Sequence, residues 1–200
     1  MIVLILCAGN QDRFNDDFAR PPQPKQLLPV HGVPLLNRTV QQVLYRGQTP
    51  VVVTHDDSIA AVAQRAGAGC IMPRYRDKTC STLWSTRGLW QERTVVLLGD
   101  VYYKQRCFNA VLGFDGKLAF FGDVDEIFGV SFTPHRALDH AITRARHTKR
   151  GKLWELYRAC EGLDLEEHVI RTNGIFHYVD DGTADVDTWE EYKALLRRIE

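Results

Sequence analysis

The sequence predicts an α/β protein in which parallel strands alternate with helices. In the N-terminal half, short apolar runs alternate with segments whose apolar residues recur at helical spacing, an order typical of right-handed parallel crossovers. The apolar runs are continuous, as expected for strands that are buried on both faces of a parallel sheet. The first run leads directly into a turn of small residues, and sheets of this class hold their ligands at such turns.

The first strand is predicted at residues 2–6, an uninterrupted apolar run that is followed by small residues at 7–9. Apolar positions within 35–44 recur at helical spacing and predict a helix that ends near Gly47. Residues 50–54 follow as a short buried strand.

A second helix is predicted with Asp57 or Ser58 as its N-terminal cap, because either side chain can accept a hydrogen bond from a free backbone N–H. Gly67 and Gly69 end this helix, and residues 70–72 form the third strand. The order strand, helix, strand, helix, strand is therefore complete within the first third of the chain.

A polar loop at residues 73–79 leads to a helix predicted over residues 80–90, and residues 94–98 form the next buried strand. That strand ends in Gly99 and Asp100. Because the carboxyl ends of parallel strands meet at one edge of a sheet, we expect this acidic side chain at the same edge as the first loop.

The pattern changes in the C-terminal half, where strands and helices no longer alternate regularly. Strands are predicted at 117–122, 127–132, 169–171 and 175–179, and helices at 135–146, 152–160 and 188–199. A basic tract at 147–152 joins the first two of these helices; it could meet a phosphate group, and a solvated helix end is the commoner outcome for such a tract. Repeats and low-complexity segments do not occur, so a single domain is expected.

The composition indicates an ordinary globular protein with one core. The chain has 200 residues, 44% of them hydrophobic, and its 25 acidic residues balance 25 basic ones. Balanced charge argues against a general nucleic-acid binder, and the first apolar run is too short to cross a membrane and lacks signal-peptide features. The five cysteines are odd in number and lack a C-x-x-C pair, which favours a reducing compartment without a zinc site. We therefore expect a cytoplasmic protein.

Two cationic side chains after the first strand indicate a polyanionic ligand. Arg13 closes the polar stretch after Gly9, and Lys25 follows Pro24, whose ring restricts the backbone. Loop amides and these two cations would form a cradle for several negative charges, and a nucleoside triphosphate is the natural ligand. Neither the P-loop pattern nor the glycine pattern of dinucleotide dehydrogenases occurs in the sequence.

These residues resemble the nucleotidyltransferases of the sugar-nucleotide pyrophosphorylase and cytidylyltransferase superfamily. The family pattern L-x-A-G-x-G-x-R corresponds to residues 6–13, and P-K-x-L-x-P-V-x-G-x-P-L corresponds to residues 24–35, almost position for position. Gln11 stands where the family has its second glycine, a residue that lets the backbone approach phosphate. The resemblance implies a GT-A-like fold, a three-layer α/β/α sandwich with a mixed, mainly parallel sheet.

The resemblance also implies a set of nucleotide-binding residues. Arg13 and Lys25 would be catalytic, because they would hold the β- and γ-phosphates of the triphosphate and favour departure of pyrophosphate. Ser81 and Thr82, at the start of a helix, would meet the base and the ribose. The full set of predicted nucleotide-binding residues is Leu6, Ala8, Gly9, Asn10, Gln11, Arg13, Lys25, Ser81 and Thr82.

Two carboxylates are predicted to hold Mg²⁺, a cation that prefers carboxylate oxygen and keeps substrate phosphates among its ligands. Asp100 is the first, because it follows a buried strand as the family's metal-binding aspartate does. Asp187 is the second; it lies in a D-x-D-T-x-E phrase typical of the family, where it is also positioned to cap the last helix. Asp185 is the alternate ligand, since two residues of extended chain place both side chains on one side.

The activity that the resemblance implies is magnesium-dependent transfer of a nucleoside monophosphate from a triphosphate to a small phosphorylated acceptor, with release of pyrophosphate. A sugar 1-phosphate is the favoured acceptor. Within a single domain at 1–200, residues 1–103 would bind the nucleotide and residues 104–200 would bind the acceptor. A phosphocholine-type cytidylyltransferase, a glycosyltransferase of the GT-A fold and a nucleotide-sensing module without turnover remain as alternatives. Neither nucleic acid nor membrane is expected as a partner, and the sequence leaves the base, the acceptor and the oligomeric state open.

Overall fold

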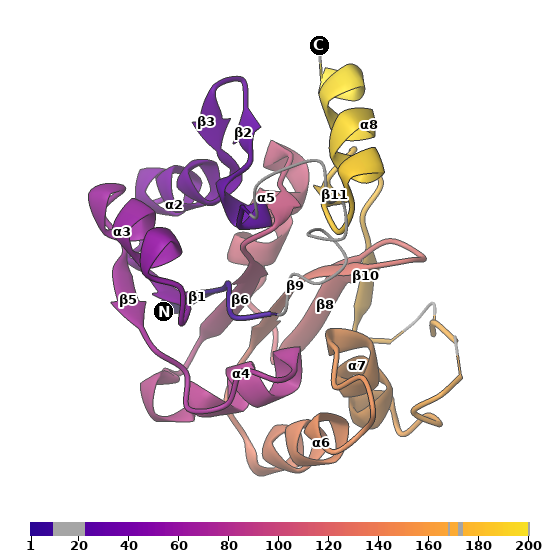
Figure 1. Cartoon of the computed structure of the whole chain (residues 1–200). Coiled ribbons are helices and arrows are strands. Elements are labelled where there is room, and N and C mark those ends of the chain that lie inside the picture. The colour runs from indigo at the N-terminus through magenta and orange to yellow at the C-terminus, as the bar shows by residue number, and fades with distance from the viewer. Residues whose placement is uncertain (10–22, 168, 172–173, 200) are drawn as a thin grey trace.

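A seven-stranded sheet forms the centre of the molecule (Figure 1). The structure is a computed structural model that describes residues 1–9, 23–167, 169–171 and 174–199. From one edge to the other, the strands are β10 (Phe176–Tyr178), β8 (Leu118–Gly122), β9 (Ile127–Phe132), β6 (Thr94–Leu98), β1 (Ile2–Leu6), β4 (Pro50–Val53) and β5 (Gly69–Ile71). Strand β9 is antiparallel to both of its neighbours, whereas the remaining neighbouring pairs are parallel. The predicted α/β class with a mixed, mainly parallel sheet is confirmed.

Helices cover both faces of the sheet and give the molecule three layers (Figure 1). One face carries α2 (Leu35–Tyr45), α3 (Asp57–Arg65) and α5 (Gln105–Gly113), and the other carries α4 (Thr79–Ser85), α6 (Arg136–Arg146) and α7 (Leu153–Glu161). In β1, Val3 and Ile5 belong to the hydrophobic core on the first face, whereas Leu4 and Leu6 belong to the core on the second. This alternation explains why the run had to be apolar throughout. In the part of the chain that the structure describes, no helix is long and apolar enough to cross a membrane.

A third, smaller core joins the C-terminal helix to the segment that follows Lys25. It combines α8 (Trp189–Ile199), the hairpin of β2 (Pro29–Val30) and β3 (Val33–Pro34), and the antiparallel pair of β7 (Val101–Tyr102) and β11 (Ala184–Asp185). The Tyr192 hydroxyl of α8 donates a hydrogen bond to the Pro29 carbonyl oxygen. The C-terminal segment is thereby packed against the N-terminal part of the chain.

The C-terminal half departs from the sequence predictions at a helix that was missed and at a predicted strand that does not form. Helix α5 was not predicted, although Cys107, Phe108, Val111 and Leu112 bury one of its faces. Its apolar residues form two adjacent pairs within nine residues, which is too short a stripe to stand out in the sequence. Residues 169–171 were predicted as a strand and are not one, because the Arg171 N–H donates to the Tyr157 hydroxyl (2.8 Å) rather than to a neighbouring strand.

The predicted starts and ends of two helices are also corrected. Asp56 caps α3, and its Oδ1 accepts hydrogen bonds from the N–H groups of Ser58 (2.8 Å) and Ile59 (3.1 Å), so the cap lies before the two predicted positions. The helix predicted over residues 80–90 ends at Ser85 and is followed by a separate 3₁₀ turn at Arg87–Leu89.

A close approach at Gly99 positions the residue that follows β6. The Gly99 N–H donates to the Leu6 carbonyl oxygen at 3.0 Å. A Cβ atom at this position would lie 2.2 Å from Cys7 Sγ and 3.3 Å from Gln26 Cγ, and real Cβ atoms do not approach a neighbour as closely as the first distance. Glycine is therefore required sterically, and it lets Asp100 follow β6 directly beside the end of β1.

The variant Gly99→Ala is expected to lose about 1–3 kcal/mol of unfolding free energy, the usual range for overpacking a close-packed core. Urea unfolding measures this loss. Gly113→Ala is the matched control, because the added Cβ at the end of α5 would meet no atom within 4 Å apart from its chain neighbours and the backbone of its own helix. In a Cys7→Ala background, which removes the clashing sulfur, Gly99→Ala should cost less; an unchanged cost in that background would contradict the steric explanation.

Candidate active site

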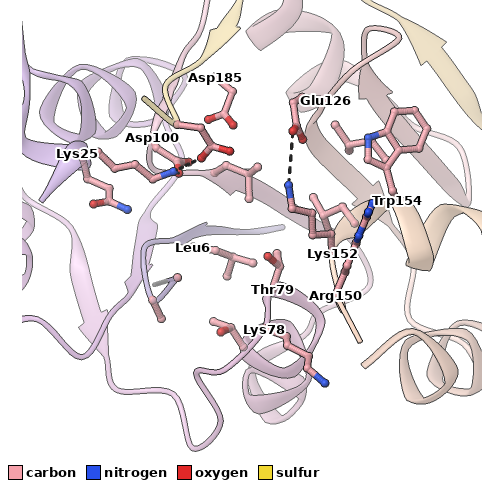
Figure 2. A pocket seen from close by; sticks show the side chains of 18 of the residues that line it. Leu6, Lys25, Lys78, Thr79, Asp100, Glu126, Arg150, Lys152, Trp154 and Asp185 are labelled. Atoms are coloured by element: carbon pink, nitrogen blue, oxygen red, sulfur yellow. Dashed lines mark hydrogen bonds and ion pairs between the residues drawn. The ribbon is translucent and has the colours of Figure 1, made fainter. Parts of the chain in front are cut away.

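A cavity of about 200 Å³ opens at the edge of the sheet where β1 and β6 end (Figure 2). Leu6, Ala8 and Gly9 line it from the first strand and its turn, and Thr79 and Thr82 line it from α4. Figure 2 shows Lys25 and Asp100 on one side of the cavity and Glu126, Lys152 and Trp154 on another. The cavity therefore receives side chains from both halves of the chain.

Three carboxylates gather on the side of the cavity that holds Lys25. The side chains of Asp100, Asp185 and Asp187 each offer an oxygen, and these oxygens all lie within 4.8 Å of one another. The ladder between β7 and β11 brings them together, because it pairs Asp185 with Val101. The Val186 N–H extends this contact by donating to the Asp100 carbonyl oxygen at 3.2 Å.

The start of α8 leaves the Asp187 side chain available to this cluster. Thr188 caps the helix, since its hydroxyl oxygen accepts from the Glu191 N–H (3.3 Å). The Glu191 carboxylate accepts in return from the N–H groups of Thr188 (2.7 Å) and Asp187 (2.8 Å), which completes a capping box. The capping role that the sequence allowed for Asp187 is therefore filled by Thr188.

Lys25 is buried among these carboxylates, with 7% of its surface exposed. Its Nζ lies 2.6 Å from Asp100 Oδ2 and also forms an ion pair with Asp187 Oδ1. A short 3₁₀ helix (Lys25–Leu27) positions it, and the Leu27 N–H closes the turn by donating to the Pro24 carbonyl oxygen at 2.8 Å. Burial alone would lower the pKa of Lys25, but the three aspartates outweigh burial and raise it, so the side chain remains an ammonium.

The cluster holds more negative charge than Lys25 neutralises. Burial raises the pKa of Asp185 well above its usual range, the charge of Asp100 raises it further, and the attraction of Lys25 only partly offsets these effects. A set of three carboxylates whose like charges raise a pKa in this way fits a hard divalent cation, which takes oxygen ligands. The residues present therefore fit the metal that the sequence predicted.

The predicted nucleotide-binding residues fall into three groups. Leu6, Ala8, Gly9, Lys25 and Thr82 line the cavity. Ser81 is buried in the first turn of α4 and is not among the lining residues. Asn10, Gln11 and Arg13 lie outside the described residues, and their roles stay predictions.

Several cavity residues were not among the predicted site residues. Gln26 follows Lys25 in the segment that resembles the family, and its buried Oε1 has no hydrogen-bond partner among the described residues. Glu126 lies between two predicted strands, and Arg150 and Lys152 belong to the basic tract, for which the sequence left open both contact with a phosphate and a solvated helix end. Trp154 lies in a helical pattern, where a tryptophan is mostly a core residue; it is 8% exposed and also lines the cavity. Charge and position along the chain do not distinguish such residues from ordinary surface or core residues.

Comparisons with known proteins identify the fold. No family model and no curated protein matches the sequence. A nucleotidyl transferase from Methanothermobacter superimposes with a TM-score of 0.68 at 15% identity, over 98% of this chain and 97% of that chain. A Bacillus anthracis protein described as a candidate glucose-1-phosphate thymidylyltransferase, in complex with sucrose, gives 0.65 at 17% identity over 99% and 94%. HddC from Yersinia pseudotuberculosis, complexed with GMP-PN, gives 0.60 at 13% identity over 100% of both chains. The chain therefore has the fold of nucleotidyltransferases, as the sequence predicted.

Asp185 should make the stability of the protein depend on pH. The pKa of Asp185 is higher in the folded protein than in the unfolded chain, so the folded state is favoured when this carboxyl is protonated. This contribution to the unfolding free energy is lost as the pH rises from the ordinary carboxyl pKa, about 4, through the folded pKa. Asp185→Asn keeps the oxygen that accepts from the Val186 N–H, so the two proteins should be equally stable near the ordinary pKa. Above it, the variant should gain about 1.4 kcal/mol over the wild type for each unit of pKa shift. Urea unfolding across a pH series in chelator-containing buffer measures this; a difference that does not change with pH would contradict the assignment.

Proposed function

We propose that this chain is a metal-dependent nucleotidyltransferase that transfers a nucleoside monophosphate from a nucleoside triphosphate to a sugar 1-phosphate. The observation that carries the proposal is the meeting of one buried ammonium and three carboxylates in a cavity at the carboxyl ends of β1 and β6. Two proteins of the same fold, one described as a candidate glucose-1-phosphate thymidylyltransferase and the other complexed with GMP-PN, support the substrate classes.

The reaction needs no nucleophile from the protein. A phosphate oxygen of the acceptor attacks the α-phosphorus of the triphosphate, a new P–O bond forms, and the bond to the departing pyrophosphate breaks. The acceptor phosphate is already ionised at neutral pH, so the task of the chain is to position two anions that repel each other and to stabilise the charge of the leaving group. A cavity lined from both halves of the chain suits this task, with residues 1–103 at the nucleotide and residues 104–200 at the acceptor.

Asp100 and Asp187 would hold Mg²⁺, with Asp185 as the neighbouring carboxylate. When bound, the cation would offset negative charge on the reacting phosphates. The three side chains are already grouped by the β7–β11 ladder and by the cap of α8, so little rearrangement of the backbone is required.

Lys25 would exchange partners during binding. In the structure its ammonium bridges Asp100 and Asp187, the two carboxylates assigned to the metal. The β- and γ-phosphates of a bound triphosphate offer the ammonium a second set of oxygens, with Arg13 as its predicted companion. Transfer of Lys25 to the phosphates would release both carboxylates and place positive charge at the leaving group.

Removing either charge from the site should abolish most turnover while the protein stays folded. Lys25→Met and Asp100→Asn are each expected to lower the rate of pyrophosphate release at least about 100-fold, the usual effect of one electrostatic contact to a transition state. Lys193→Met is the control, because Lys193 pairs with Glu190 on the exposed surface of α8. Release of pyrophosphate from a triphosphate and a panel of sugar 1-phosphates is the assay. Near-normal rates in either site variant would refute the proposal.

Lys25 and a metal ion should compete for the same carboxylates. Without nucleotide, Lys25→Met is expected to bind Mn²⁺ about tenfold or more tightly than the wild type, because the variant lacks the ammonium that competes with the metal ion for Asp100 and Asp187. A non-hydrolysable triphosphate should strengthen Mn²⁺ binding more in the wild type than in the variant. Electron paramagnetic resonance of free Mn²⁺ measures both effects; equal Mn²⁺ affinities without nucleotide would contradict the exchange.

A further inference from the structure

The side of the cavity away from Lys25 has a charge pattern of its own. Glu126 comes from the connection between β8 and β9, Arg150 and Lys152 come from the connection between α6 and α7, and Trp154 lies in the first turn of α7. Figure 2 shows Glu126 and Lys152 facing each other, and Lys152 Nζ lies 3.5 Å from Glu126 Oε1. None of these residues belongs to the nucleotide-binding segments that the family resemblance covers best.

The basic loop, residues 147–152, is held in place by Cys80 of α4 and by Lys78, the residue that precedes this helix. Lys78 Nζ donates to the carbonyl oxygens of Thr148 (2.8 Å) and Arg146 (3.4 Å). The N–H of Cys80 donates to the Gly151 carbonyl oxygen (2.8 Å), and Cys80 Sγ donates to the Lys152 carbonyl oxygen (3.0 Å). The backbone that carries Arg150 and Lys152 is therefore positioned before any ligand arrives.

Gly151 lets the loop fit against this support. Its φ is +57°, in the left-handed region that favours glycine. A Cβ atom there would also lie 2.6 Å from Lys78 Cδ and 2.8 Å from Lys78 Cβ. Arg150 and Lys152 therefore flank a position that only glycine occupies without strain, and both line the cavity. A rigid backbone that carries two cations binds an anion at a lower entropic cost than a mobile loop would.

The charges on this side leave one cation without an acidic partner. Lys152 is matched by Glu126, and Lys78 lies 4.0 Å from Asp77. Arg150 forms no ion pair with any residue that the structure describes. This wall of the cavity therefore favours an anionic group and disfavours a quaternary ammonium.

An aromatic cage for a quaternary ammonium is also lacking in the described part of this wall. Trp154 is the aromatic residue that lines the cavity, and it is only 8% exposed. Phe176 stacks on its ring at 5.5 Å, and the Arg158 guanidinium lies over the ring at 5.7 Å. Little of the ring face is left for a ligand, whereas choline recognition relies on several free aromatic faces.

We propose that Arg150 and Lys152 bind the phosphate of the acceptor and that Glu126 accepts a hydrogen bond from an acceptor hydroxyl. The inference rests on the proposed nucleotidyltransferase function and names the residues that would select a sugar phosphate over phosphocholine as its acceptor. When Lys152 turns towards the incoming phosphate, it gives up its ion pair with Glu126, and an oxygen of the Glu126 carboxylate can then accept a hydrogen bond from a sugar hydroxyl.

The test compares three variants with a matched control. Arg150→Gln and Lys152→Gln are expected to raise the KM for the best hexose 1-phosphate about tenfold or more, with the KM for the triphosphate unchanged. Glu126→Gln should weaken binding of that hexose 1-phosphate and strengthen binding of inorganic phosphate, because Lys152 is then free of its carboxylate partner. Lys149→Gln, an exposed cation of the same loop that does not line the cavity, should behave like the wild type.

Calorimetric titration with glucose 1-phosphate, phosphocholine and inorganic phosphate separates this inference from the proposed function. If no acceptor supports pyrophosphate release but hexose phosphate binding is lost in Arg150→Gln and Lys152→Gln, the proposed function fails and the acceptor assignment stands. Acceptor KM values within twofold of the wild type in both variants would overturn the assignment. Preference of the wild type for phosphocholine over every hexose 1-phosphate tested would overturn it as well.

Discussion

The proximity of three carboxylates at the end of β6 is the constraint on which the site depends. Their oxygens lie within 4.8 Å of one another at partly buried positions, where like charges repel strongly unless a cation shares them. Lys25 is that cation, and its burial is tolerated because the aspartates raise its pKa. One ammonium does not balance three carboxylates, so the same cluster that stabilises Lys25 retains an attraction for further positive charge.

The topology of the sheet explains why one cavity has two differently charged sides. Strand β8 runs parallel to the central strands, so its carboxyl end lies at the same edge as the ends of β1 and β6. The turn into the antiparallel strand β9 therefore carries Glu126 to that edge. The basic loop reaches the cavity from the helical layer, where Lys78 and Cys80 hold it. The proposed reaction joins two phosphates and would need positive charge at both reactants, and Lys25 and the basic loop would supply it from separate parts of the chain.

The sequence was sufficient where neighbouring residues decide the outcome. Strand β1 was predictable because burial on both faces demands an apolar residue at every position. The position of Lys25 was predictable because its proline-containing phrase closely matches a known pattern. Helix α5 was missed because its apolar face is short, and the cap of α8 fell on Thr188 because the capping box with Glu191 depends on where the helix begins.

The sequence by itself determined the class of the fold, most of its strands and helices, and the chemical type of the groups that follow β1 and β6. These properties depend on periodicity and on residues that are close along the chain. Only the tertiary structure decided that Lys25 bridges Asp100 and Asp187, and that Arg150 and Lys152 line a cavity and do not simply face solvent. The sequence does not distinguish a charged side chain at the surface from one in a binding site. The partners of such a side chain depend on strand pairing and packing between distant parts of the chain, here the β7–β11 ladder and the contacts between α4 and the basic loop.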